Sequence, residues 1–328
     1  MREQQQTYVV EACARLHFGL LQTAAERTRR FGGVGLFLRD PAWKMTLSRG
    51  NDLRLAGIPL PSELIEIVHT LMRDWRSRHQ SGVELRITSA VPLHVGLGSK
   101  TSFVQALSAG LAAIAGEADE APALFARSGR GRTSGIGSSA PLGGGFTLDV
   151  GVRGAETWLP SSSATWCERS ATAAKFRFPE CRILLARETE TIGLSGLAEQ
   201  KLFGDNLPSS EAEIDKLAAV VLFDLIPSIT TEDLPGVREA IRRMQDLGFK
   251  RIEWGAQPPL LHQLRQYIET DGGACALSSM GPTIAIFSDN SPGVVAEAIR
   301  KEFGDVFELN ETGPMNDTPV RAKPLNML

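Results

Sequence analysis

Two hydrophobic patterns alternate in the first half of the chain. β-Branched or alternating apolar residues predict strands at 7–14, 83–89 and 146–150. Apolar residues at helical spacing, among them Leu64, Val68 and Trp75, predict a helix at 61–79, and residues 101–115 are small and apolar enough for a buried helix. This half therefore mixes strands with helices.

The second half of the chain is richer in helical patterns. Helices are predicted at 210–226, 234–247, 257–270 and 292–303, and strands at 275–279 and 283–288. The tail after residue 312 is rich in Pro and Asn, and we expect it to be ordered only where it docks. The alternation predicts an α+β architecture of two parts, which we place at 1–170 and 171–328.

Composition narrows the function classes. The chain has 328 residues with 42% apolar residues, 22% charged residues and a net charge of −3, as in ordinary globular proteins. The lack of a long basic run argues against nucleic acid as a partner. No stretch approaches the roughly 20 apolar residues that span a bilayer, and the N-terminus does not resemble a signal peptide. We expect a cytoplasmic protein that does not bind membranes.

The cysteines predict no metal site. Cys13, Cys167, Cys181 and Cys275 are far apart and form no CxxC pair. Their spacing fits neither a zinc site nor a disulfide framework, so free thiols are expected.

A glycine-rich segment at 91–102 carries the first candidate chemistry. It contains Gly96, Gly98, Ser99, Lys100, Thr101 and Ser102 directly before the predicted helix at 101–115. Glycines allow close backbone approach, a helix N-terminus offers N–H donors and positive dipole charge, and Lys100 adds a full charge. The segment predicts a phosphate or pyrophosphate site, although it is not a Walker loop. The alternative is a tight turn before a capped helix.

Two further segments have weaker signals. Residues 128–137 place Arg130, Arg132, Thr133 and Ser134 in a glycine-rich loop, where arginines could grip a phosphate bidentately. The alternative is a solvated surface loop. Ser278 and Ser279 follow a strand of small residues and precede a Gly-Pro turn, which can line a site or be only a turn.

A fourth group lies near the N-terminus. Arg15 and His17 would project from the same face of a strand, and Arg30 precedes the pair Gly32-Gly33. A lone histidine is usually structural, but its pairing with Arg15 near a Gly-Gly loop favours a functional role.

Together these segments resemble the GHMP-kinase superfamily. Residues 92–99 resemble its P-x-x-x-G-L-G-S-S motif, with Lys100 where a kinase usually has a second serine, and 278–282 resemble its S-S-x-G-P motif. The chain is more similar to the β-ribofuranosylaminobenzene 5′-phosphate synthase family, which has the same fold. That resemblance covers almost the whole chain, through residues 14–20, 31–36, 96–101, 129–137, 144–149, 160–162 and 247–250.

The resemblance implies a GHMP-kinase-like fold with two domains, the first at 1–170 with the phosphate-binding loops and the second at 171–328. It also implies a C-glycoside synthase of methanopterin biosynthesis that uses phosphoribosyl pyrophosphate (PRPP), bound with Mg²⁺, and an aromatic or heteroaromatic carboxylic acid. Catalytic roles would fall to Lys100, Arg15, His17 and Asp149. Substrate binding would fall to Arg30, Gly32, Gly33, Gly96, Gly98, Ser99, Thr101, Ser102, Arg130, Arg132, Thr133, Ser134, Ser278 and Ser279. Arg15, His17 and Arg30 could hold either the acceptor carboxylate or the ribose 5-phosphate end. The metal ligands and the oligomeric state are left open, with a homodimer as one option.

Two departures from the family pattern concern the acceptor. Arg132 replaces a glycine of the family's G-R-G-G-T-S-G-I-G loop, and Val152 stands where the family pattern G-G-F-x-x-D-G-G-H has histidine. These changes favour the similar C-glycoside synthases of C-nucleoside antibiotic (formycin-type) biosynthesis, with a small azole dicarboxylate as acceptor. The methanopterin-type synthase is the alternative. A small-molecule kinase using ATP is the runner-up, against which Lys100 and the whole-chain resemblance argue, and a non-catalytic ligand-binding relative is a third reading.

Overall fold

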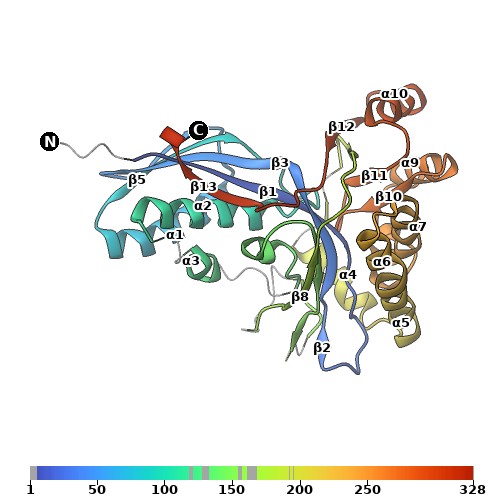
Figure 1. Ribbon diagram of the computed structural model, residues 1–328. Helices are drawn as coiled ribbons and strands as arrows, with labels where there is room; N and C mark the ends of the chain where they lie inside the picture. The colour runs from blue at the N-terminus through green and yellow to red at the C-terminus, as the bar shows by residue number, and fades with distance from the viewer. Residues whose placement is uncertain are drawn as a thin grey trace.

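The computed structural model describes residues 6–117, 121–127, 133–153, 157–160, 168–191, 193–194 and 196–327. Two main sheets organise these residues, and a two-stranded ribbon, β2 (Arg29–Arg30) with β7 (Val152–Arg153), lies beside them. Figure 1 shows the larger sheet with its helices at one end of the molecule and the helix-rich second half at the other.

The larger sheet has seven strands. Five run in the order β13 (Val320–Pro324), β1 (Tyr8–Gly19), β3 (Gly33–Gly50), β5 (Gly82–Ser89) and β4 (Arg54–Gly57), while β6 (Phe146–Asp149) pairs with β3 and β8 (Thr172–Phe176) pairs with β6. Helices α1 (Ser62–His79), α2 (Ser99–Ala115) and α3 (Ala121–Arg127) lie together on one side of this sheet (Figure 1). Strand β1 buries alternate residues such as Val10, Ala12 and Leu16, and α2 packs against it.

The smaller sheet has four strands in the order β10 (Ala274–Leu277), β11 (Ile284–Phe287), β9 (Ile183–Glu188) and β12 (Phe307–Thr312). Helices α7 (Leu234–Met244), α9 (Pro259–Thr270) and α10 (Pro292–Phe303) pack against its strands. The remaining helices of this half are α4 (Leu197–Asn206), α5 (Glu211–Ala219), η3 (Val220–Leu225), α6 (Ile226–Thr230) and α8 (Gly248–Gly255). Short 3₁₀ turns occur at η2 (Gly137–Leu142) and η4 (Leu325–Met327).

The described part of the chain contains no helix with the length and apolar character needed to cross a membrane. Cys13, Cys181 and Cys275 are free thiols, and Cys167 lies outside the described residues.

The predicted helices and strands are confirmed with small shifts at their ends, and the helix at 292–303 has the predicted bounds. The hydrophobic pattern did not predict β3, because Pro41 interrupts the alternation of apolar and polar residues. The pairing register between β3 and β1 shifts near this proline. The pattern also did not predict helices α3, α4 and α8, or the strands β2, β4, β7, β8, β9, β12 and β13. The helix predicted at 210–226 is an α-helix that continues into a π-helical stretch, η3.

The tail docks onto the first half of the chain. Residues 320–324 form β13, which pairs antiparallel with β1 from Tyr8 to Ala12. A division at residue 170 would separate both β8 and β13 from the sheet with which they pair.

Candidate active site

A cavity of about 490 Å³ lies where β1 ends, α2 begins, and α8 and the turn after β10 approach both. It brings together most of the residues selected from the sequence. Those that line it are Arg15, His17, Gly96, Gly98, Ser99, Lys100, Thr101, Thr133, Ser134 and Ser279. The four glycine-rich or polar segments therefore meet at one place, although they lie far apart in the sequence.

The glycine-rich loop directs the N-terminus of α2 into the cavity. Gly98 adopts a left-handed conformation (φ 72°) as the residue before the helix, and its carbonyl accepts hydrogen bonds from the Thr101 and Ser102 amides. The positive end of the helix dipole therefore faces the cavity, as an anion requires. Ser102 does not line the cavity, because its hydroxyl donates to the Ser99 carbonyl of its own helix at 3.2 Å.

Ser278 joins three segments behind the cavity. Its hydroxyl donates to the Gly96 carbonyl at 2.9 Å and accepts from the His17 amide at 3.1 Å. A side chain at Gly96 would place its Cβ 2.1 Å from the Ser278 carbonyl oxygen, so this close approach requires glycine. The neighbouring Ser279 lines the cavity, and its amide donates to the His17 carbonyl at 2.9 Å.

Lys100 forms an ion pair with Glu63 of α1. Glu63 also contacts His94 Nε2 at 2.8 Å, and all three residues line the cavity. Burial acts to raise the pKa of the Glu63 carboxyl, but hydrogen bonds from Lys100 and His94 hold it below its usual value. Lys100 is thus positioned by a carboxylate that the sequence did not indicate. His94 lies inside the glycine-rich motif, which was its only signal.

Arg15 and His17 project from the same face of β1, as predicted, and both line the cavity. Arg15 Nη1 donates to the Gly96 carbonyl at 2.6 Å. His17 is only 3% exposed, and neither ring nitrogen has a hydrogen-bond partner among the described residues. Burial, together with the charges of Arg15 and Lys250, lowers the pKa of His17 well below its usual value, so the imidazole is neutral.

A buried ion pair between Lys250 and Glu253 of α8 lies next to this group. Lys250 also donates to the carbonyls of Leu277 and Ser279, at 3.0 and 3.2 Å, while Glu253 lines the cavity. Burial lowers the pKa of Lys250 and raises that of Glu253, and their mutual attraction opposes both shifts. Lys250 belongs to the family-like segment 247–250 but was not selected as a site residue, and Glu253 carried no signal in the sequence.

Asp149 lies behind the loop at 133–137 and does not line the cavity. Its carboxylate accepts hydrogen bonds from the amides of Gly135 (2.5 Å) and Gly151 (2.9 Å) and from the Ser170 hydroxyl. Burial raises the pKa of Asp149, while these hydrogen bonds act to lower it. The structure therefore gives Asp149 a positioning role, because it holds the loop that presents Thr133 and Ser134.

We expect Asp149→Ala to weaken pyrophosphate binding through this loop. The substitution leaves the buried amides of Gly135 and Gly151 unpaired, at a cost of about 1–3 kcal/mol for each group. The thermal midpoint should fall and the dissociation constant for pyrophosphate should rise, with Asp149→Asn less affected because its amide oxygen can still accept one bond. An Ala variant with unchanged midpoint and unchanged pyrophosphate affinity would rule out this role.

Arg30, Gly32 and Gly33 do not line the cavity. Arg30 stacks over the Trp158 ring at 4.7 Å. Gly32 (φ 65°) and Gly33 permit close packing, since a Cβ at Gly32 would lie 2.6 Å from the Asp149 carbonyl oxygen and one at Gly33 would lie 2.8 Å from His17 Nε2. Arg130 and Arg132 lie outside the described residues.

Part of the cavity lining is apolar. Its apolar lining residues include Leu20, Leu194, Phe203 and Met280. They belong to or pack against a hydrophobic cluster that includes Phe31 and Phe249. A flat, apolar group could therefore bind against these residues without leaving polar atoms unpaired.

The described residues contain no cluster of three or more His, Cys, Asp or Glu side chains that could hold a metal ion. The carboxylates that line the cavity are Glu63, Glu199 and Glu253. Such a set suits a cation that is held mainly by a bound phosphate group, with one or two protein carboxylates.

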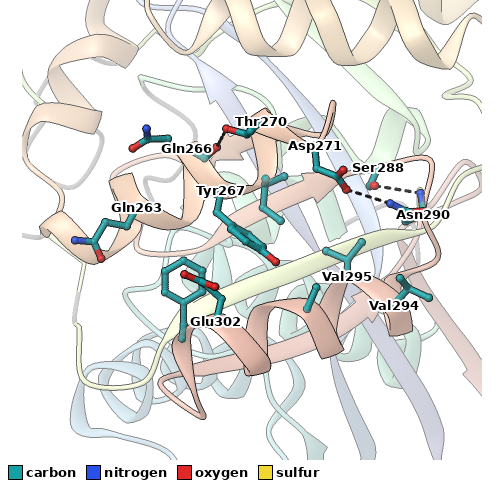
Figure 2. A pocket seen from close by; sticks show the side chains of 13 residues that line it. Gln263, Gln266, Tyr267, Thr270, Asp271, Ser288, Asn290, Val294, Val295 and Glu302 are labelled. Carbon is teal, nitrogen blue, oxygen red and sulfur yellow. Dashed lines mark hydrogen bonds between the residues drawn. The ribbon is translucent and has the colours of Figure 1, made fainter.

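A larger groove of about 650 Å³ lies on the outer surface between α9 and α10. Figure 2 shows Tyr267 and Glu302 in this groove, with Asn290 hydrogen-bonded to Asp271. None of the described residues selected from the sequence lines it. The smaller cavity is therefore the candidate active site.

The chain is similar in sequence to named proteins over most of its length. No protein-family model matches the chain. The chain is similar to the beta-ribofuranosylphenol 5′-phosphate synthase of Methanothermobacter thermautotrophicus, with 29% identity over 313 residues that cover 90% of this chain and 93% of the relative. It is also similar to the protein of that name from Archaeoglobus fulgidus, with 28% identity over 294 residues that cover 89% and 91%.

Solved structures of similar fold include small-molecule kinases. Homoserine kinase from Cytophaga hutchinsonii aligns with a TM-score of 0.64 at 13% identity over 98% of this chain and 99% of that chain. Phosphomevalonate kinase from Streptococcus pneumoniae aligns with a TM-score of 0.65 at 14% identity over 94% and 99%. The chain thus has the predicted α+β GHMP-kinase-like fold. At these identities the likeness establishes the fold and not the reaction.

Proposed function

We propose that this chain is a C-glycoside synthase, which transfers the 5-phosphoribosyl group of PRPP to a ring carbon of an aromatic carboxylic acid and releases pyrophosphate and carbon dioxide. The observation that carries the proposal is the mixed lining of the cavity. Lys100 and the N-terminus of α2 suit a pyrophosphate, and Leu20, Phe203 and Met280 in the same cavity suit an aromatic ring.

The acceptor that this proposal favours is a benzoate such as 4-hydroxybenzoate or 4-aminobenzoate. The relatives are named for a ribofuranosylphenol product, which supports the methanopterin-type alternative over the C-nucleoside one. Val152, one of the two departures behind the C-nucleoside expectation, is fully buried in the cluster with Phe31 and does not line the cavity. The other, Arg132, lies outside the described residues.

The residues of the cavity meet the demands of this reaction. As pyrophosphate leaves C1 of the ribose with the bonding electron pair, Lys100 and the amides at the start of α2 stabilise its growing charge. The ring carbon that bears the carboxylate bonds to C1, and loss of carbon dioxide returns an electron pair to the ring. No base is needed to remove a ring proton. The protein therefore acts by positioning both substrates and by excluding water, which would otherwise give ribose 5-phosphate.

Mg²⁺ bound with PRPP fits the residues present. Glu63 is the carboxylate next to Lys100, so it would hold the ion together with the pyrophosphate oxygens once Lys100 turns to the ligand. The ion would neutralise part of the pyrophosphate charge.

A thermal-shift comparison tests the donor. We expect PRPP with Mg²⁺ to raise the thermal midpoint and ATP with Mg²⁺ to have little effect, because only a ligand that binds the folded state stabilises it. Equal or greater stabilisation by ATP would support a kinase instead.

A further inference from the structure

Arg15 differs from Lys100 and Lys250 in forming no ion pair with any carboxylate that the structure describes. Lys100 is paired with Glu63, and Lys250, behind the cavity wall, is paired with Glu253. Among the described residues, no carboxylate forms an ion pair with Arg15, whose one hydrogen bond runs from Nη1 to the Gly96 carbonyl. A guanidinium has five N–H donors, so most of its hydrogen-bonding capacity remains for a ligand.

The guanidinium of Arg15 keeps its charge in this position. Burial lowers its pKa to about 10, and the nearby charge of Glu253 opposes that shift. The Lys250–Glu253 pair is neutral as a unit, and His17 is neutral as well. One positive charge therefore remains uncompensated on this side of the cavity, which suits a singly charged anion. A phosphate dianion would leave an excess negative charge beside Glu253.

Arg15 also lies beside the glycine-rich loop, in the same cavity as the apolar lining residues. A Cβ built on Gly98 would be 3.0 Å from Arg15 Nε, so the side chain packs against the residue from which α2 begins. His17, two residues further along β1, accepts a hydrogen bond from the Ser279 amide, and Met280 follows Ser279 in the lining. A group bound to Arg15 is therefore next to the glycine-rich loop and shares the cavity with the apolar residues.

We propose that Arg15 binds the carboxylate of the acceptor acid and so places the ring carbon that bears it beside C1 of the phosphoribosyl donor. This inference rests on the proposed function and assigns the acceptor subsite within it. The ring carbon that forms the new bond is the carbon that carries the carboxylate, so the carboxylate site must adjoin the pyrophosphate site. Bond formation to C1 expels pyrophosphate, and cleavage of the bond to the carboxylate returns its electron pair to the ring. Carbon dioxide is neutral, so Arg15 releases it, and the product has no group left to pair with Arg15.

The test compares 4-hydroxybenzoate with 4-hydroxybenzamide, which has the same ring and no charge. Dissociation constants are measured by calorimetry with Mg²⁺ and pyrophosphate present, for the wild-type protein and for Arg15→Gln, Arg15→Lys and Lys100→Ala. We expect the wild type to prefer the acid by about 10²-fold, because charge-assisted bidentate contacts are strong. In Arg15→Gln the preference should fall to within about 3-fold, with little change in pyrophosphate affinity, since the loop and Lys100 remain. Lys100→Ala should show the reverse, with weaker pyrophosphate binding and an unchanged preference for the acid.

Two results would overturn the assignment. One is an unchanged preference for the acid in Arg15→Gln, and the other is a loss of pyrophosphate affinity in that variant as large as in Lys100→Ala. If Arg15→Gln does not fold, as judged by its thermal midpoint, Arg15→Lys takes its place in the test. This variant keeps the charge but loses the bidentate geometry, so it should keep only part of the preference for the acid over the amide. Failure of the proposed function can be told apart from failure of this assignment. In that case the wild type, supplied with PRPP, would release no carbon dioxide from any acid.

Discussion

Lys100→Ala is expected to lower turnover by about 10²- to 10³-fold, as for the loss of one donor to a developing negative charge. Lys100 lines the cavity beside the N-terminus of α2, where pyrophosphate would leave. Its ion pair with Glu63 holds the ammonium group at this place before the ligand arrives. The measurement is single-turnover release of pyrophosphate from saturating PRPP and 4-hydroxybenzoate.

Matched variants separate charge from position in this prediction. Lys100→Arg keeps the charge and should retain more turnover than the alanine variant. Lys201→Ala removes a lysine that is 76% exposed and pairs with Asp205 on α4, so it should behave as the wild type. Wild-type turnover in Lys100→Ala would show that the glycine-rich loop does not carry the leaving group.

The largest expected effect on stability comes from Lys250→Met. Lys250 and Glu253 are almost completely buried, with side chains 1% and 4% exposed. Removal of one partner of a buried ion pair leaves an uncompensated charge and costs about 3–5 kcal/mol. Here the carbonyls of Leu277 and Ser279 also lose a donor. The free energy of unfolding from urea titration should fall accordingly.

The double variant Lys250→Met/Glu253→Leu is the control for the ion pair. Since it removes both charges, it should recover much of the lost stability, although the two carbonyls still lack their donor. Lys201→Met on the exposed surface should change stability by less than about 1 kcal/mol. A Lys250→Met protein as stable as the wild type would contradict the burial of this pair.

Hydrophobic periodicity identified the longer helices and part of the strands, and it missed helices α3, α4 and α8 and several strands. Helix α10 has the predicted bounds, because Pro292 at its start and Gly304 after its end mark it in the sequence. Strand β3 was missed because Gly33, Gly35 and Pro41 interrupt its pattern, although β1 and β5 pair along most of its length. The docking of β13 onto β1 depends on a partner more than 300 residues away, which local pattern cannot indicate.

The sequence identified the glycine-rich lining of the cavity better than the residues that hold this lining in place. Glycines and hydroxyl residues before a helix carry a local signal, and Gly96, Gly98 and Thr101 do line the cavity. Glu63 and Glu253 belong to ordinary amphipathic helices, and only tertiary contacts with Lys100 and Lys250 give them a role. Asp149 was selected for its motif, yet its partners are backbone amides that only the folded loop supplies.

The most direct test of the proposed function is the release of carbon dioxide and pyrophosphate from PRPP, Mg²⁺ and a single acid. With 4-hydroxybenzoate or 4-aminobenzoate, we expect equimolar release of both products and a ribosylated ring that lacks the carboxylate, at a higher rate than with an aminopyrazole dicarboxylate. Faster turnover of the azole dicarboxylate would move the acceptor back to the C-nucleoside class. Release of pyrophosphate without carbon dioxide from every acid tested, with ribose 5-phosphate as the only sugar product, would contradict C-glycoside synthesis.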